Sequence, residues 1–215
     1  MSECMKIFCV YNKYTQNRIM DGRKIDRSME NPIDNILIDI SYHVGQAIKH
    51  IPYMSPNVIT SLSLIVSLYA VYKIFNGFYM IGGILFFFGY FLDCLDGNFA
   101  RSNNMVTDFG DYYDHISDQV KIIALIAVIL VMKIKVKTKA VFLCFGLILA
   151  FLSCVQIDCQ EKNSVAPKSD TLSLLVGGLC PHKSYIYKSR YFGSGTSYLF
   201  ICLFIINIDF INKIL

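Results

Sequence analysis

Two pairs of aspartates stand beside apolar runs at spacings that suit a helix. Asp93 and Asp96 are three residues apart, and Asp114 and Asp118 are four apart, so the members of each pair share one helix face. The first pair ends an apolar run and the second pair precedes another. Two antiparallel helices could therefore direct all four carboxylates into one space at the edge of a membrane.

A divalent metal ion is the simplest partner for these carboxylates. Ionised groups close to hydrocarbon are costly unless an opposite charge accompanies them. The nearest cationic residues, Arg101 and Lys121, are too few to neutralise the cluster. Because the ligands would all be oxygens, with no histidine or cysteine at metal-ligand spacing, we expect Mg²⁺ or Mn²⁺ rather than zinc. One pair alone is more often a solvated helix end, but two pairs beside apolar runs favour a metal site.

The segment between the two pairs is suited to binding a phosphate. Gly97, Ala100 and Gly110 are small where helices must approach closely or where a ligand must reach the backbone. Arg101 adds a guanidinium, whose planar fork of donors matches phosphate oxygens. We therefore expect a phosphate-bearing ligand next to the metal.

The composition favours a bilayer as the solvent of this chain. Hydrophobic residues make up 54% of it and charged residues 17%, with a mean hydropathy of +0.47, whereas about a quarter of the residues of soluble domains are charged. The apolar residues gather in runs, which is typical of membrane-spanning helices. The formal charge of +4 is modest and no basic stretch is dense, so nucleic acid is not an expected partner.

The apolar runs predict an all-α integral membrane fold, a bundle of five to six transmembrane helices. Five runs are long enough, if their helices extend into the headgroup region: residues 58–72, 78–92, 122–132, 140–157 and 192–208. The third helix can begin near Gly110. A sixth segment, 172–181, is short and interrupted by two glycines, so it could be a re-entrant segment, a short helix or a surface loop.

An amphipathic helix is predicted ahead of the spans, in residues 31–54. Asn31 is suited to cap it and Pro32 to occupy its first turn. The helix is too polar to span, so we expect it to lie along the membrane interface. An ordinary amphipathic helix on a soluble core remains the alternative. The chain would then comprise a polar N-terminal segment (1–30), this helix, and a transmembrane catalytic domain (55–215) with the motif at 93–118.

Cysteines and charges give two further expectations. Cys144, Cys154 and Cys202 lie within apolar runs, and the chain has neither a CxxC pair nor a recognisable secretory signal, so we expect reduced, structural thiols.

Seven lysines and arginines precede the first span, which favours a cytosolic amino terminus, although four lysines in residues 133–139 oppose this orientation.

The motif resembles the signature of a known enzyme family. The pattern Asp93-x2-Asp96-Gly97-x2-Ala100-Arg101-x8-Gly110-x3-Asp114-x3-Asp118 is similar to that of the CDP-alcohol phosphotransferases (class-I CDP-alcohol phosphatidyltransferases), which form the headgroup linkages of phospholipids. All eight specified residues and every spacing agree. Residues 55–60 (SPNVIT) resemble the family's opening of the first span, and the likeness covers roughly residues 31–135. The family usually has six spans.

The resemblance implies a role for each matching position. Asp93, Asp96, Asp114 and Asp118 would hold the metal. Asp118 would also act as the catalytic base that accepts the proton of the incoming hydroxyl. The CDP pocket would be formed by Gly97, Ala100, Arg101 and Gly110, with Asn57 and Thr60 as additions. The acceptor oxygen would attack the phosphorus that carries the donor alcohol, and CMP would leave without a covalent enzyme intermediate.

The resemblance also implies the partners. They are a CDP-linked lipid or alcohol as donor, a small or lipid alcohol as acceptor, and membrane lipids; a homodimer is left open. The active site would face the cytosol, in the endoplasmic reticulum if the source is eukaryotic.

Two substrate assignments compete. The short chain and Arg190 favour transfer of a phosphatidyl group from CDP-diacylglycerol to a small polar alcohol, although an arginine in this position is more often a plain anchor at the membrane surface. The Asp114-His115 pair and the opening at residues 31–34 favour transfer from CDP-choline or CDP-ethanolamine to diacylglycerol; His115 itself is expected to be structural. A divalent-cation transporter is a more remote alternative, and a catalytically inactive binding homologue is left open.

Overall fold

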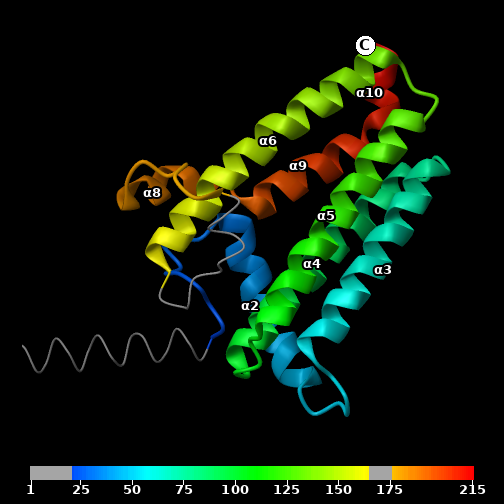
Figure 1. Cartoon of the computed structure of the whole chain (residues 1–215). Coiled ribbons are helices and arrows are strands. Elements are labelled where there is room, and N and C mark those ends of the chain that lie inside the picture. The colour runs from blue at the N-terminus through cyan, green and yellow to red at the C-terminus, as the bar shows by residue number, and fades with distance from the viewer. Residues whose placement is uncertain (1–20, 165–175) are drawn as a thin grey trace, which may run out of the picture.

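The computed structural model describes residues 21–164 and 176–215, and in these residues the protein is all-helical, as predicted (Figure 1). The N-terminal segment predicted at 1–30 is described only from residue 21 onward, because residues 1–20 lie outside the described part. Residues 172–175 of the predicted 172–181 segment likewise lie outside it, and its described part, residues 176–181, contains no helix long enough to span a membrane.

The first described helix, α2, comprises Pro32–Ile48 and begins as the sequence predicts. The side-chain oxygen of Asn31 accepts hydrogen bonds from the backbone nitrogens of Ile33 (2.9 Å) and Asp34 (3.4 Å), and Pro32 follows the cap. The helix ends at Ile48, ahead of the two prolines. It packs against α4 and α9.

The face that α2 buries combines polar residues with apolar ones such as Leu37 and Ile38. Asp34 and Asn35 are buried, whereas Ile36 and Ile40 are exposed. Asp34 bonds to Tyr90 of α4 and to Gly195 of α9, whereas Asn35 bonds to Arg23 and to the carbonyl of Arg27 in the N-terminal segment.

Three helices are long and apolar enough to cross a membrane: α3 (Pro56–Phe75), α4 (Tyr79–Ser102) and α6 (Val136–Asn163). A fourth candidate is a bent unit in which Lys183–Ile206 meets Ile208–Ile214 at 67°. This unit contains the short helices η1 (Lys183–Tyr185), α8 (Ile186–Ser189) and η2 (Arg190–Phe192), followed by α9 (Ser194–Ile206) and α10 (Ile208–Ile214). The described residues thus support three to four of the five to six predicted spans.

The remaining long helix, α5, comprises Asp108–Val131 and has the mixed character predicted for it. Its first half carries the acidic residues of the motif and its second half is apolar. With 24 residues it is about 36 Å long at 1.5 Å per residue, which exceeds the ~30 Å thickness of a bilayer core. It is therefore the polarity of its first half, and not its length, that keeps α5 out of the set of apolar spans.

Close backbone approach holds α3 and α4 together as an antiparallel pair. A Cβ atom added to Gly89 would lie 2.1 Å from Ser67 Oγ, and one added to Gly82 would lie 2.5 Å from a side-chain carbon of Ile74. Ser63 Oγ also donates a hydrogen bond to the carbonyl of Gly89 (2.8 Å). Small residues allow this packing, as is usual between helices in membranes.

The main hydrophobic core lies toward the end of the bundle away from α2, and many apolar side chains face outward (Figure 1). The core joins α3, α4, α5, α6 and α9 through residues such as Phe86 and Ile129. On α6, Leu147 and Phe151 are 70% and 60% exposed. Such a surface is unfavourable in water but suits hydrocarbon, so these helices are those of a membrane protein.

A disulfide between Cys159 and Cys180 corrects the expectation of reduced thiols. The bond joins the end of α6 to the segment before η1, and Cys159 is completely buried. Cys144, Cys154 and Cys202 are free, as expected. The sequence did not reveal the pair because its members are 21 residues apart and meet only where the chain folds back after α6.

Candidate active site at the aspartate motif

Three of the four motif aspartates converge at the end of the bundle where α2 lies. The chain turns at residues 103–107, so the end of α4 and the start of α5 reach the same end of the molecule (Figure 1). Asp93 of α4 and Asp114 and Asp118 of α5 each offer a carboxylate oxygen, and these oxygens lie within 4.8 Å of one another. That spacing suits several ligands of one cation.

Asp96 lies outside this trio but beside it. Its side chain is buried next to Thr60 of α3 and within electrostatic reach of Asp93. One oxygen of Asp96 (Oδ2) and one of Asp114 (Oδ1) are buried and lack a hydrogen-bond partner in the described part of the chain. Buried unpaired carboxylate oxygens are costly, so these two atoms fit a site built to receive a cation. An all-oxygen donor set of this kind suits Mg²⁺ or Mn²⁺.

Lys121 enters the same cluster from α5. Its ammonium donates to Asp93 Oδ1 (2.6 Å) and to Asp118 Oδ1 (2.9 Å), and the residue is 1% exposed. From the sequence, Lys121 was recognisable as a nearby cation, but its position in the cluster was not. The spacing of three residues between Asp118 and Lys121 was the feature of the sequence that could have predicted their contact, because residues three apart lie on one face of a helix.

Arg101 is held at the end of α4 by the N-terminal segment. Its Nε donates to the carbonyl of Gly22 (2.7 Å), and its Nη1 lies 3.1 Å from the place where a Cβ of Gly97 would be. Asn98 Nδ2 also donates to the carbonyl of Asp21 (2.8 Å). Gly97 therefore leaves room for the guanidinium, which lies within electrostatic reach of Asp96 and Asp114.

Gly110 marks the contact between the first turns of α3 and α5. Thr107 caps α5 by accepting a hydrogen bond from Gly110 N (3.1 Å). A Cβ on Gly110 would lie 3.3 Å from Asn57 Oδ1. Ser61 Oγ and the Tyr113 hydroxyl, 2.9 Å apart, join the same two helices.

The residues that the resemblance assigns to the CDP pocket therefore come from α3, α4 and α5. Asn57 and Thr60 belong to α3, Gly97, Ala100 and Arg101 to α4, and Gly110 to α5.

A second buried acidic group lies between α2, α4 and α9, and the sequence analysis missed it. Tyr90 donates its hydroxyl to Asp34 Oδ1 (2.7 Å), and Gly195 N donates to Asp34 Oδ2 (3.3 Å). Burial raises the pKa of Asp34 to about 6. Burial, and then the negative charge of Asp34, raise the pKa of Glu30 to about 7. Glu30 accepts hydrogen bonds from Asn31 N and Gln160 Nε2.

Arg190 lies in η2, beside the N-terminal segment. The Arg190 side chain donates a hydrogen bond from Nη1 to the carbonyl oxygen of Ser28, and the Arg190 carbonyl oxygen accepts one from Asn31 Nδ2 (2.6 Å). The guanidinium carbon of Arg190 lies 5.4 Å from the centre of the Tyr191 ring. The Nε of Arg190 is buried without a hydrogen-bond partner in the described residues.

His115 is close to an acidic residue of its own helix. Its Nε2 lies 3.5 Å from Oδ1 of Asp111, which is one turn earlier on α5.

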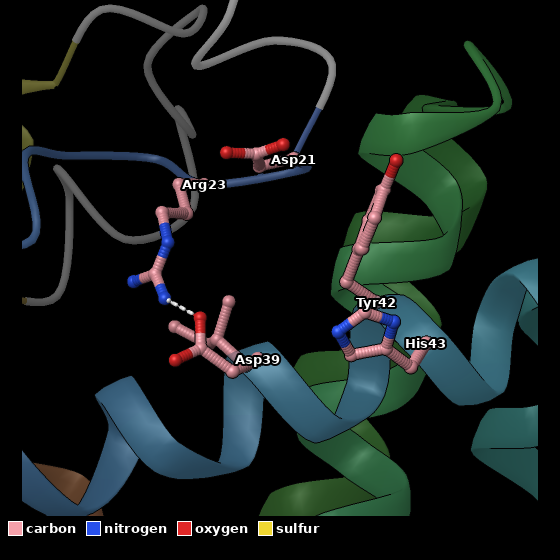
Figure 2. A pocket seen from close by; sticks show the side chains of 6 residues that line it. Asp21, Arg23, Asp39, Tyr42 and His43 are labelled. Atoms are coloured by element: carbon pink, nitrogen blue, oxygen red, sulfur yellow. Dashed lines mark hydrogen bonds and ion pairs between the residues drawn. The ribbon is translucent and has the colours of Figure 1, made fainter.

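A separate hollow of about 220 Å³ lies between the N-terminal segment and α2 (Figure 2). Its lining comprises Asp21, Arg23, Ile38, Asp39, Tyr42 and His43. Arg23 and Asp39 form an ion pair across it, as Figure 2 shows. None of the lining residues belongs to the aspartate motif, so this hollow is distinct from the candidate active site.

The sequence of the chain is similar to those of known proteins. The chain matches the sequence model of the CDP-alcohol phosphatidyltransferase family over residues 53–205, more than half of its length. The protein therefore belongs to this family, as the motif predicted.

Among individual relatives, the chain is similar to an archaetidylinositol phosphate synthase of Pyrococcus horikoshii. The two are 33% identical over 66 residues, which is 31% of this chain and 35% of the relative. The matched stretch thus spans about a third of the curated relative's length.

Proposed function

We propose that this protein is a membrane enzyme of phospholipid biosynthesis that transfers a phospho-alcohol group from a CDP-linked donor to an acceptor alcohol and releases CMP. The observation that carries this proposal is the convergence of Asp93, Asp114 and Asp118 within 4.8 Å in a member of this family. A cluster of carboxylates beside an arginine suits a reaction that needs positioning and charge neutralisation more than covalent chemistry.

In this proposal Asp93, Asp96, Asp114 and Asp118 form the Mg²⁺ or Mn²⁺ site. A divalent ion bound there would neutralise the diphosphate of the donor and stabilise the charge that develops on transfer. The unpartnered oxygens of Asp96 and Asp114 support the assignment, because each is a buried acceptor that lacks a donor in the described structure.

The residues around the metal site would bind and orient the CDP donor. Arg101 is suited to the diphosphate because its bond to Gly22 O fixes the plane of the guanidinium beside Asp96 and Asp114. Gly97 and Gly110 keep the surrounding backbone accessible. The pocket would be completed by Ala100 and, from α3, by Asn57 and Thr60.

Asp118 is our candidate for the general base. It would accept the proton of the acceptor hydroxyl while the hydroxyl oxygen attacks the phosphorus of the donor. The bond from phosphorus to the CMP oxygen would then break, and CMP would leave. Lys121 donates a hydrogen bond to Asp118 Oδ1 (2.9 Å), which would hold the carboxylate in position.

For the substrates, we propose a phosphatidyl-type donor and a small polar acceptor. Arg190 supports this choice, because its buried Nε has no hydrogen-bond partner in the described residues and lies near the start of α9. The likeness to a relative named for making archaetidylinositol phosphate points the same way. His115, by contrast, lies close to Asp111 on its own helix, which gives the aminoalcohol branch no added support.

We further propose that α2 lies along the membrane interface and that the site opens to the cytosol, with residues 55–215 as the catalytic domain. The exposed Ile36 and Ile40 of α2 support the first point. The seven cationic residues before the first span support the second.

Release of CMP by the purified protein would test the proposal. The donors are radiolabelled CDP-diacylglycerol, offered with inositol, inositol phosphate, serine or glycerol phosphate, and CDP-choline, offered with diacylglycerol. We expect CMP release with CDP-diacylglycerol and its loss in Asp93→Ala and Asp96→Ala proteins that still insert into membranes. Turnover with CDP-choline alone would reassign the substrates. Movement of divalent cations across liposomes without any CMP release would favour the transporter.

A further inference from the structure

The segment that precedes α2, residues 21–31, is neither helix nor strand, yet much of it is buried against the bundle. Buried backbone groups need hydrogen-bond partners, and a segment without regular structure has to find them elsewhere. Here the partners are side chains of α2, α4 and η2, and an ion pair adds α6. The segment is therefore an ordered part of the molecule that crosses several helices.

The start of this segment is fixed to the end of α4, beside Arg101. Asn98 Nδ2 donates to the carbonyl of Asp21 (2.8 Å), and Arg101 Nε donates to the carbonyl of Gly22 (2.7 Å). The bond to Gly22 uses Nε and not the two Nη nitrogens, which belong to the same planar fork and suit a phosphate. The segment thus holds the guanidinium from one side.

Gly22 is the residue that allows this contact. Its φ of +66° lies in the left-handed region, which residues with a side chain rarely adopt. A Cβ atom on Gly22 would lie 2.7 Å from both the Nδ2 and the backbone oxygen of Asn98. A larger residue would have to move away from α4, and the carbonyl that holds Arg101 would move with it.

The rest of the segment is anchored on other helices. Arg23 is 8% exposed and donates to Asn35 Oδ1 of α2 (2.8 Å), and Lys24 pairs with Glu161 of α6. Because these contacts do not involve α4, they fix the segment independently of Arg101. The segment can therefore hold the arginine in place and is not merely carried by it.

We propose that residues 21–31 form a strap that positions Arg101 for the diphosphate of the CDP donor, and that Gly22 is the positioning residue of this strap. The inference rests on the proposed function, because it assumes a CDP-linked donor. The strap lies outside residues 53–205, over which the chain matches the family model. Gly22 acts through Arg101, so its replacement should weaken binding of the donor.

Binding of CDP to the detergent-purified protein in saturating Mg²⁺, measured by isothermal titration calorimetry, would test the inference. We expect Gly22→Ala to raise the Kd of CDP by about tenfold, the size of loss that one misplaced hydrogen bond from a charged group brings. Gly77→Ala is the matched control. Gly77 also has a positive φ (+83°), but it lies in the turn between α3 and α4, with open space where a Cβ would be. The Kd of Gly77→Ala should equal that of the wild type, and an equal rise in both variants, or none in Gly22→Ala, would overturn the inference.

A double-mutant cycle separates the positioning of Arg101 from a general loosening of the site. If Gly22 acts through Arg101, Gly22→Ala should not raise the Kd further in an Arg101→Ala background. A further tenfold rise in that background would mean that Gly22 acts on another group, and it would overturn the inference.

Asn98→Ala keeps the inference testable if Gly22→Ala fails to fold. It removes the bond to the carbonyl of Asp21 and adds no bulk. The Kd of CDP should rise when Asn98→Ala is made in the wild type and stay constant when it is made in an Arg101→Ala background. No rise in the wild type, or equal rises in both backgrounds, would count against the strap.

Failure of the inference and failure of the proposed function give different results. Equal CDP binding by the wild type and Gly22→Ala, with CMP release by the wild type, would overturn the strap alone. CDP binding that depends on Gly22, without CMP release from any donor, would support the strap and refute the proposed transfer. No CDP binding by the wild type would overturn both.

Discussion

Asp118→Asn keeps the shape of the Asp118 side chain and removes its charge and its capacity to accept a proton. Asp118 lies one helical turn after Asp114 and bonds to Lys121, which still has Asp93 as a partner when Asp118 is changed. The ammonium would thus stay in place, and the fold of the site should survive. The main loss should be the general base itself.

The size of the expected effect follows from that role. A positioned general base typically contributes about 10²- to 10⁴-fold to the rate, so we expect kcat to fall by at least about 100-fold, or about 2.7 kcal/mol in the activation barrier. The KM for the CDP donor should change little, because Arg101 and the glycines of the pocket are untouched.

The assay is CMP release under saturating Mg²⁺, with kcat and the KM of the donor measured separately. Asp108→Asn is the matched control: it makes the same substitution at an exposed position in the first turn of α5 and should leave turnover unchanged. Near-normal turnover by Asp118→Asn would refute the assignment of the base. A loss confined to donor affinity would make Asp118 a metal ligand only.

Four further predictions concern the metal, Arg190, the disulfide and Glu30. Excess EDTA should abolish CMP release and added Mg²⁺ or Mn²⁺ should restore it, because the carboxylates would otherwise repel the diphosphate; full activity in EDTA would argue against a metal enzyme. Arg190→Ala should raise the KM of an anionic acceptor and leave that of the donor nearly unchanged, whereas equal effects would indicate a membrane anchor. Replacing Cys159 and Cys180 by serine should lower the free energy of unfolding by about 3 kcal/mol, because the bond closes a loop of 21 residues; a thermal unfolding curve with and without reductant checks this. Burial raises the pKa of Glu30 from 4.5 to about 7, so the folded protein binds this proton more tightly and its stability should fall as the pH rises through that window; Glu30→Gln should flatten this part of the stability–pH curve.

Local signals along the sequence determined much of the fold and of the motif. Asn31 and Pro32 marked the start of α2 to the residue, because capping depends only on neighbouring backbone groups. The spacing of Asp114 and Asp118 placed both on one face of α5, because the period of a helix is fixed by its own geometry. The motif at residues 93–118 predicted the family, and the match of the family's sequence model over residues 53–205 confirmed it.

The tertiary structure alone decided which side chains meet across helices. Asp34 is a charged residue of the amphipathic helix α2, yet it bonds to Tyr90 of α4 and to Gly195 of α9. Periodicity defines the faces of a helix but not which face meets the bundle, and in a membrane both the bundle and the lipid accept apolar residues.

The contacts of Lys121 and the Cys159–Cys180 bond are two further examples of contacts that the sequence alone does not predict. A lysine three residues after Asp118 was visible in the sequence, but its second bond, to Asp93, depends on how α5 lies relative to α4. Cys159 lies in α6 and Cys180 before η1, and their contact depends on how these two parts of the chain pack together. Spacing along a chain fixes contacts within one helix, whereas contacts between helices depend on their rotation and separation, which only the packing of the whole bundle determines.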